Sequence, residues 1–265
     1  MAETEIEETP APQASAGETT RFVYGNYGSI ITGKDPTWQY GGFPLPDGSF
    51  WQYREPNAVV VVEGDLMRVA VMPITRSNDQ VQVLDNAKNM YFSTRMFEPP
   101  EQGTMTLEWE QSARCLGTAP GDLYDGFVSI NLLDFKVGLA IDVFMCNDKI
   151  ATVYARLPFP GVPPAEQTRT DRPAYFCYFH ELDLPTRPGQ LHHCKIAYTK
   201  SKDELVFWID GQEVSHYTEV PVKMDSFLIA LGLMTEKQID QGKSTSVHGQ
   251  GLVGTWGPFT ITITA

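Results

Sequence analysis

The chain has 265 residues, of which 42% are hydrophobic and 11% aromatic, so its composition is that of a globular protein with a substantial core. Its formal net charge of −13 at pH 7 argues against a nucleic-acid partner or an anionic membrane surface, because binding phosphate needs a basic surface. No segment is apolar enough over a sufficient length to cross a bilayer.

The first 20 residues are acidic, rich in proline and alanine, and free of aromatic side chains. This composition predicts a disordered tail, and residues 21–265 are predicted to form a single domain. The tail has neither the basic nor the apolar segment of a secretory signal, so we expect a cytoplasmic protein. Residues 22–50 are rich in glycine and aromatic residues, which predicts irregular loops that carry aromatic rings.

The rest of the chain consists of short apolar or alternating segments separated by turn signals, which is typical of β-strands. The Glu63-Gly64-Asp65 and Asp210-Gly211 sequences suit tight hairpin turns, because glycine accepts a positive φ. The proline-rich stretch 158–173 predicts a long loop. Strands are predicted at 58–62, 66–71, 89–96, 104–114, 127–133, 137–146, 149–157, 175–182, 196–200, 205–209, 212–217, 227–233 and 252–264.

Consecutive strands joined by short turns leave no room for crossover helices, and no long segment has a helical apolar period. The sequence therefore predicts an all-β fold, an antiparallel β-sandwich.

Two segments resemble a known family. GQLHHCKIAYTKSKDELVFWIDGQEV, residues 189–214, is similar to a strand pair of concanavalin A-like jelly rolls, particularly family 16 glycoside hydrolases of the laminarinase and lichenase type. GLAIDVF, residues 138–144, resembles the strand on which those enzymes carry their catalytic acids. The resemblance covers about residues 55–263 and implies a jelly roll with a cleft on its concave face.

The resemblance also implies that the catalytic glutamates are missing. Their positions correspond to Ala140 and Phe144, and only the central aspartate, Asp142, remains. A retaining glycosidase needs two carboxyl groups about 5 Å apart, so ordinary retaining hydrolysis at this strand is not expected.

Strand alternation suggests which side chains share the cleft with Asp142. We expect Asp142, Tyr154, Arg156 and His180 to be catalytic, with Asn131, Phe144 and Tyr178 binding the substrate. In this arrangement Asp142 orients the substrate or acts as an acid or base. The alternatives are a solvated face with an Asp142–Arg156 salt bridge, and a hydrogen-bonded His180 at the edge of the core.

Two further groups complete the predicted binding residues. Glu108 and Glu110 share one face of a strand, either as a displaced carboxylate pair or as a solubilising outer surface. Trp38, Tyr40 and Trp51 offer ring faces to a sugar or another flat ligand, and the alternative is that they fill the edge of the sandwich.

No metal or cofactor motif is present. The four cysteines, Cys115, Cys146, Cys177 and Cys194, have no C-x-x-C spacing and are predicted to be buried free thiols rather than zinc ligands. His192 and His193 are adjacent in a strand and point in opposite directions, so they are not expected to hold one metal. A structural calcium on loop acids such as Asp225 stays open.

Three hypotheses about the function follow. The preferred one is a cytoplasmic enzyme that uses the cleft for elimination, isomerisation or cyclisation of a small, partly apolar substrate. The second is a non-catalytic, lectin-like module that binds a glycan, and the third is a structural or interaction domain. The expected partner is thus a small molecule or a glycan, and the sequence does not indicate an oligomeric state.

Overall fold

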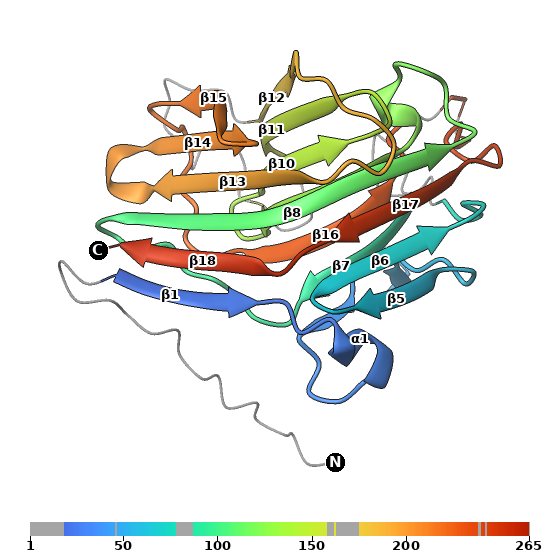
Figure 1. Cartoon of the computed structure of the whole chain (residues 1–265), viewed down its shortest axis with the longest axis horizontal. Coiled ribbons are helices and arrows are strands. Elements are labelled where there is room, and N and C mark those ends of the chain that lie inside the picture. The colour runs from blue at the N-terminus through green and yellow to red at the C-terminus, as the bar shows by residue number, and fades with distance from the viewer. Residues whose placement is uncertain are drawn as a thin grey trace.

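The computed structural model describes residues 19–45, 47–77, 87–157, 162, 175–237, 240–241 and 243–264. This part of the chain forms two antiparallel sheets stacked as a sandwich, and Figure 1 shows them as two layers. No helix within the described ranges is long and apolar enough to cross a membrane.

One sheet has nine strands. They are β1 (Thr19–Tyr24), β5 (Val59–Glu63), β6 (Leu66–Val71), β8 (Thr104–Leu116), β13 (His192–Thr199), β14 (Glu204–Ile209), β15 (Gln212–Tyr217), β17 (Gly251–Trp256) and β18 (Phe259–Thr264). Their order is β15, β14, β13, β8, β17, β6, β5, with β18 paired to β8 and β1 paired to β18. The long strand β8 is therefore central, and it pairs with β17 and β18 along successive parts of one edge.

The other sheet has seven strands. They are β2 (Trp38–Tyr40), β7 (Lys88–Ser93), β9 (Phe127–Asp134), β10 (Leu139–Met145), β11 (Ile150–Arg156), β12 (Phe176–Glu181) and β16 (Leu228–Met234), in the order β12, β11, β10, β9, β16, β7, β2. A small hairpin of β3 (Gly42–Pro44) and β4 (Phe50–Gln52), a single helix α1 (Gly28–Thr32) and 3-10 turns at Leu123–Asp125 and Lys200–Lys202 complete the described elements.

The core lies between the two sheets and is almost entirely hydrocarbon. Leu107 and Trp109 of β8 and Ile130 of β9 are all buried there. Polar contacts also join the layers, since the Gln111 side-chain amide donates to the carbonyl of Val128. These contacts identify which face of each strand points inward.

The predicted antiparallel β-sandwich is confirmed, and so are its predicted turns. Gly64 has a φ of 60°, and Asp210 and Gly211 have φ values of 51° and 80°, as a tight hairpin turn requires. The last predicted strand, 252–264, is instead two strands, because the Gly257-Pro258 step interrupts the ladder and proline has no N–H to donate.

The prediction of irregular loops for residues 22–50 was wrong. This segment contains the second half of β1, all of α1, β2 and β3, and the start of β4. Strand β1 begins at Thr19, inside the predicted tail, because it pairs with β18 at the far end of the chain, a partner that no local pattern shows. Residues 1–18 and, apart from Val162, the predicted loop 158–173 lie outside the described residues.

Candidate functional site

The direction of Asp142 follows from the pairing of its strand. Asp142 lies directly opposite Asn131 on β9 and Val153 on β11, so these three side chains share one face of the seven-stranded sheet. The neighbouring Thr152 points to the other face, where its hydroxyl lies 2.7 Å from that of Ser215 on the opposite sheet. Asp142 therefore lies on the outer face of the seven-stranded sheet, away from the core between the layers.

Small side chains surround Asp142 on this outer face. We call them the small-residue floor, and they are Ser129, Ala140, Ala151, Ala155, Ala230 and Gly232, all buried. Larger apolar groups border the floor, including Phe144, whose ring centroid lies 4.3 Å from that of Phe127. Of the two positions that the resemblance assigns to catalytic glutamates, Ala140 is thus a floor residue and Phe144 a packed ring.

Asp142 is an unusual group in such surroundings. The residue is only 5% exposed, and its Oδ1 has no hydrogen-bond partner among the described residues. Burial raises the pKa of Asp142 well above its ordinary value, the nearby Glu236 carboxylate raises it further, and Lys88 opposes the shift. The protonated, uncharged form of the carboxyl group is therefore favoured.

Lys88 and Glu236 form an ion pair near Asp142 that the sequence did not indicate. The Lys88 Nζ lies 3.2 Å from Glu236 Oε1, and the two side chains are only 10% and 17% exposed. Burial lowers the pKa of Lys88, but the charges of Glu236, Tyr53 and Asp142 outweigh it, so the pKa is raised overall. The two residues are 148 positions apart in sequence, at the start of β7 and just after β16. Because they are so far apart, no local sequence motif indicates the pair.

Asn131 is tied into the floor. Its amide donates to the hydroxyl of Ser129 at 2.9 Å and to the carbonyl of Ala230 at 3.2 Å. Both bonds hold the amide within the sheet, so Asn131 lies beside Asp142, as expected, with its donors already in use.

The expectation that Tyr154, Arg156, Tyr178 and His180 share a face with Asp142 was wrong. Tyr154 lies opposite Ile141 and Tyr178, not Asp142, so these alternate residues point inward. The Arg156 Nε donates to the carbonyl of Val137 at 2.9 Å. A shift of one residue in register exchanges the two faces of a strand, and the strand order alone does not fix that register.

The inward-facing residues form a second cluster at the open edge of the sandwich. Tyr154 and Tyr178 line a cavity of about 270 Å³ together with Tyr217 of β15. The His180 Nδ1 lies 2.9 Å from the hydroxyl of Ser215, which also contacts Thr152. The structure therefore brings Tyr154, Tyr178 and His180 near one another, but on the other side of the sheet from Asp142.

The remaining predicted residues lie elsewhere. Glu108 and Glu110 point outward from the nine-stranded sheet, where Glu108 lies 4.0 Å from the Lys195 ammonium, so they are on the opposite side of the sandwich from Asp142. Trp38 is buried in the core, with its ring 5.7 Å from that of Tyr27.

Tyr40 and Trp51 are partly buried rings, and each is covered by an arginine. The Arg54 guanidinium lies 4.8 Å from the Tyr40 ring centroid, and that of Arg76 lies 4.4 Å from the Trp51 centroid. These cation–π contacts occupy one face of each ring.

Within the described ranges, no three His, Cys, Asp or Glu side chains gather in a way that suits a metal ion. His192 instead bonds through Nδ1 to Asp210 at 2.7 Å and through Nε2 to Thr186 at 2.9 Å. The Asp225 carboxylate pairs with Lys200 at 2.6 Å. All four cysteines are free and three are buried, but the predicted burial was wrong for Cys177, which is exposed on the edge strand β12.

Comparison with known proteins places the chain in a recognisable fold. It is similar to an endo-1,3-beta-glucanase from Streptomyces sioyaensis, with a TM-score of 0.56 and 13% identity over 97% of this chain and 100% of that one. It is similar to a beta-glucanase of Bacillus licheniformis, with a TM-score of 0.52 and 13% identity over 96% and 100%. It also spans 19% of a sialidase, with a TM-score of 0.50, 11% identity and 94% of this chain covered.

The expected likeness to family 16 jelly rolls is therefore confirmed at the level of the fold. No functionally curated protein matches the sequence. Residues 24–265 match the model of a family described as a family of unknown function (DUF6081).

Proposed function

The chain belongs to the DUF6081 family, and on that premise we propose that it is an enzyme acting on a small, partly apolar substrate at the outer face of the seven-stranded sheet. The supporting observation is Asp142, a lone buried carboxyl group whose Oδ1 has no hydrogen-bond partner among the described residues. Burial favours the protonated form of such a group, and acid-catalysed elimination, isomerisation or cyclisation needs a positioned proton donor.

Hydrolysis by the retaining route is disfavoured by the surroundings of Asp142. That route needs a second carboxylate free to attack, yet Ala140 and Phe144 supply none. Glu236 is the acidic group whose charge reaches Asp142, and it is held by Lys88 at 3.2 Å.

Each group has a role in the proposed reaction. Asp142 gives its proton to the substrate atom that gains an electron pair, and a proton released at another substrate atom returns to the carboxylate, so no external oxidant or reductant is required. The Lys88–Glu236 pair adjusts the proton affinity of Asp142 through opposed charges. The small-residue floor and Phe144 provide apolar surface that keeps water from competing for the proton.

The test is the substitution Asp142→Asn, which keeps the shape and removes the acidic proton. The protein is incubated with a metabolite extract of the cells that produce it, and mass spectrometry follows one compound as it becomes an isomer or loses a small leaving group. We expect Asp142→Asn to slow that conversion by roughly 100-fold or more. The matched control is Asp183→Asn, at an exposed aspartate outside the site, which should convert at the native rate. Equal rates for the native protein and Asp142→Asn would contradict the proposal.

A glycan-binding module is the second candidate, and the tyrosine-lined cavity favours it. Tyr178 is 44% exposed, and its ring stacks on that of Tyr217 with centroids 5.8 Å apart. Sugar rings pack on such aromatic faces. Binding of laminarihexaose that is lost in Tyr178→Ala and kept in Asp142→Asn, without any conversion, would support this function instead of the enzyme.

A further inference from the structure

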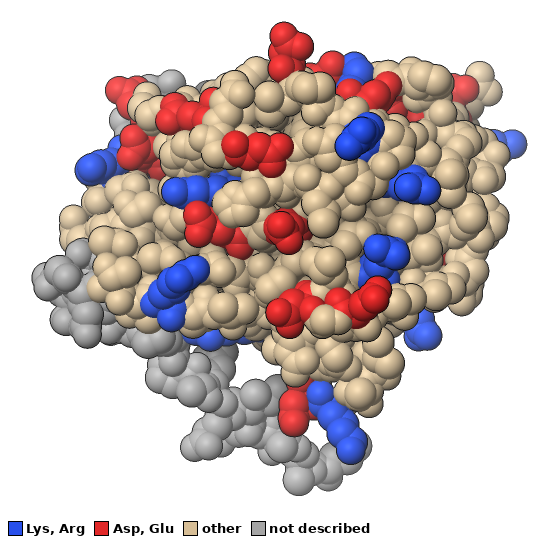
Figure 2. Space-filling view, in the orientation of Figure 1, with Lys and Arg blue, Asp and Glu red and all other residues tan. Residues whose placement is uncertain are grey.

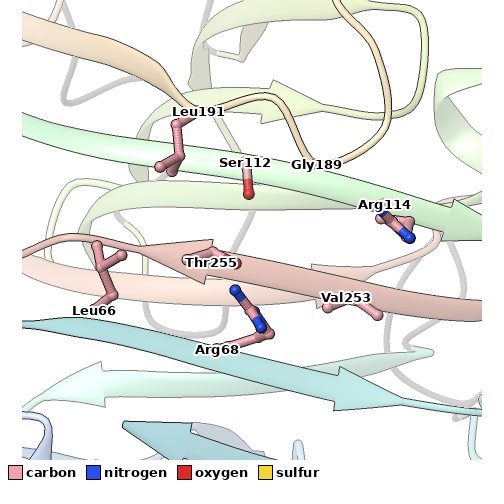
Figure 3. A pocket seen from close by; sticks show the side chains of 8 residues that line it. All are labelled: Leu66, Arg68, Ser112, Arg114, Gly189, Leu191, Val253 and Thr255. Atoms are coloured by element: carbon pink, nitrogen blue, oxygen red, sulfur yellow. The ribbon is translucent and has the colours of Figure 1, made fainter. Parts of the chain in front are cut away.

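A separate groove lies on the outer face of the nine-stranded sheet, on the side of the sandwich opposite to Asp142. Its volume is about 350 Å³, and β6, β8, β17 and the segment before β13 line it. We call it the arginine groove, after Arg68 and Arg114 (Figure 3).

The strand register explains why these side chains meet. Ser112 on β8, Thr255 on β17 and Arg68 on β6 are direct partners across three neighbouring strands, so they form one row on the same face. Arg114 lies two residues after Ser112, opposite Val253, and belongs to the next row of that face. The two arginines thus rise on either side of β17, and Figure 3 shows Arg68 extending from β6 toward Thr255.

The polar groups of the groove have no partners within the described part of the chain. Among the described residues, neither the Arg68 nor the Arg114 guanidinium forms an ion pair or a hydrogen bond, and neither do the hydroxyls of Ser112 and Thr255. Other cations of the same sheet do find carboxylates, as Lys195 does with Glu108. Two unpaired guanidinium groups are therefore a notable feature of a chain with a net charge of −13. Figure 2 shows basic side chains on the right half of this face, the half that holds the β6, β8 and β17 region.

The backbone leaves room for the Arg114 side chain. A Cβ on Gly189 would lie 3.3 Å from an Arg114 terminal nitrogen, so glycine gives the guanidinium its space. The Gly189 amide donates to the carbonyl of Ala113 at 2.6 Å, which holds this segment against β8. The wall of the groove beside Arg114 is thus attached to the sheet.

We propose that the arginine groove binds a small organic anion through a carboxylate, phosphate or sulfate group. The planar guanidinium fork pairs with such groups through two parallel hydrogen bonds. Ser112 and Thr255, both buried at the base, add hydroxyl donors, while Leu66 and Leu191 offer apolar surface for a carbon skeleton. The volume lies within the roughly 300–1,000 Å³ of small-molecule sites.

Isothermal titration calorimetry of the full chain tests the groove, with citrate, pyrophosphate and inorganic sulfate as separate probes at constant ionic strength. We expect at least one probe to bind, and which probe it is distinguishes the three anionic groups. Arg68→Gln and Arg114→Gln should each weaken binding roughly 10-fold or more, because each removes a charge-assisted pair. Arg68→Lys should restore only part of the affinity, since lysine keeps the charge and lacks the fork.

The matched control is Arg21→Gln, which removes the same charge from an exposed position on β1 of the same sheet. It should leave binding unchanged. Failure of all three probes to bind at millimolar concentration would overturn the proposal, and so would equal weakening by the three glutamine variants. Asp142→Asn should not affect this binding, so the calorimetric result for the arginine groove is independent of the proposed enzyme activity.

Discussion

Asp142 on β10 and Val153 on β11 face each other directly across an antiparallel ladder. This pairing places Asp142 on the outer face of its sheet and turns Tyr154, the next residue of β11, toward the core. The aspartate is consequently surrounded by alanine, valine and serine rather than by tyrosine and arginine. Its environment is therefore a floor of small side chains, with Asn131 beside it and the Lys88–Glu236 ion pair near it.

Asp142→Asn is expected to stabilise the folded protein increasingly as the pH rises from about 4, the ordinary pKa of an aspartate, into the neutral range. The pKa of Asp142 is raised in the folded state, so its favourable contribution is complete below the unfolded pKa of about 3.9 and is lost as the pH rises toward the folded value. Urea unfolding of both proteins across this pH range measures the difference.

Asp47 provides a control, because its pKa is shifted in the opposite direction to that of Asp142. Hydrogen bonds from Ser49 lower the pKa of Asp47, so this exposed group stabilises the folded state above its unfolded pKa and loses that effect as the pH falls. Asp47→Asn should therefore lower stability at neutral pH and become neutral in acid. Identical pH profiles for Asp142→Asn and the native protein would contradict the raised pKa.

Glu236→Gln is expected to destabilise the protein by about 3 kcal/mol, because it leaves the Lys88 ammonium buried without its carboxylate. The double variant Lys88→Met with Glu236→Leu should recover much of that loss. Chemical denaturation measures the free energy of unfolding of the native protein, of Glu236→Gln and of the double variant. Glu181→Gln breaks the more exposed pair with Lys149 and should cost little stability, because solvent screens that pair. A similar loss at both sites would contradict the expectation that burial makes the Lys88–Glu236 pair matter more.

Gly232→Ala is expected to destabilise the protein by about 1–3 kcal/mol through overpacking of the floor. A Cβ at Gly232 would lie 2.5 Å from the hydroxyl oxygen of Ser129. Ser129→Ala removes that oxygen, so the double variant should be more stable than the sum of the two single changes predicts. Thermal unfolding of the three variants measures this coupling, and strict additivity would argue against the close contact.

Trp38→Ala is expected to cost about 3–5 kcal/mol, because it opens a cavity among Tyr24, Tyr27 and Phe259. Trp51→Ala should cost less, since that ring is only partly buried. Urea unfolding compares the two. Equal losses would mean that Trp51 also acts as a core residue.

Local patterns predicted most of the architecture. The alternation in 104–114 became β8, the Asp210-Gly211 turn joins β14 to β15, and the likeness of residues 189–214 to family 16 enzymes led to the correct fold. These features depend on neighbours in sequence, so they are visible there. The same local patterns failed for residues 22–50, where β1 and β2 pair with β18 and β7 far along the chain. The short hairpin of β3 and β4 in this segment was also missed, although its two strands are close in sequence.

The alternation of residues along each strand states only which side chains share a face. It predicted that Asp142 and Phe144 share one face of their strand, and that Tyr154 and Arg156 share one face of theirs. Both groupings hold in the structure. Whether those two pairs lie on the same face of the sheet depends on the register between β10 and β11. The ion pair of Lys88 with Glu236 depends on the packing of β7 beside β16. Register and strand neighbourhood come from the combined packing of the whole sandwich, so only the folded chain could assign the residues around Asp142.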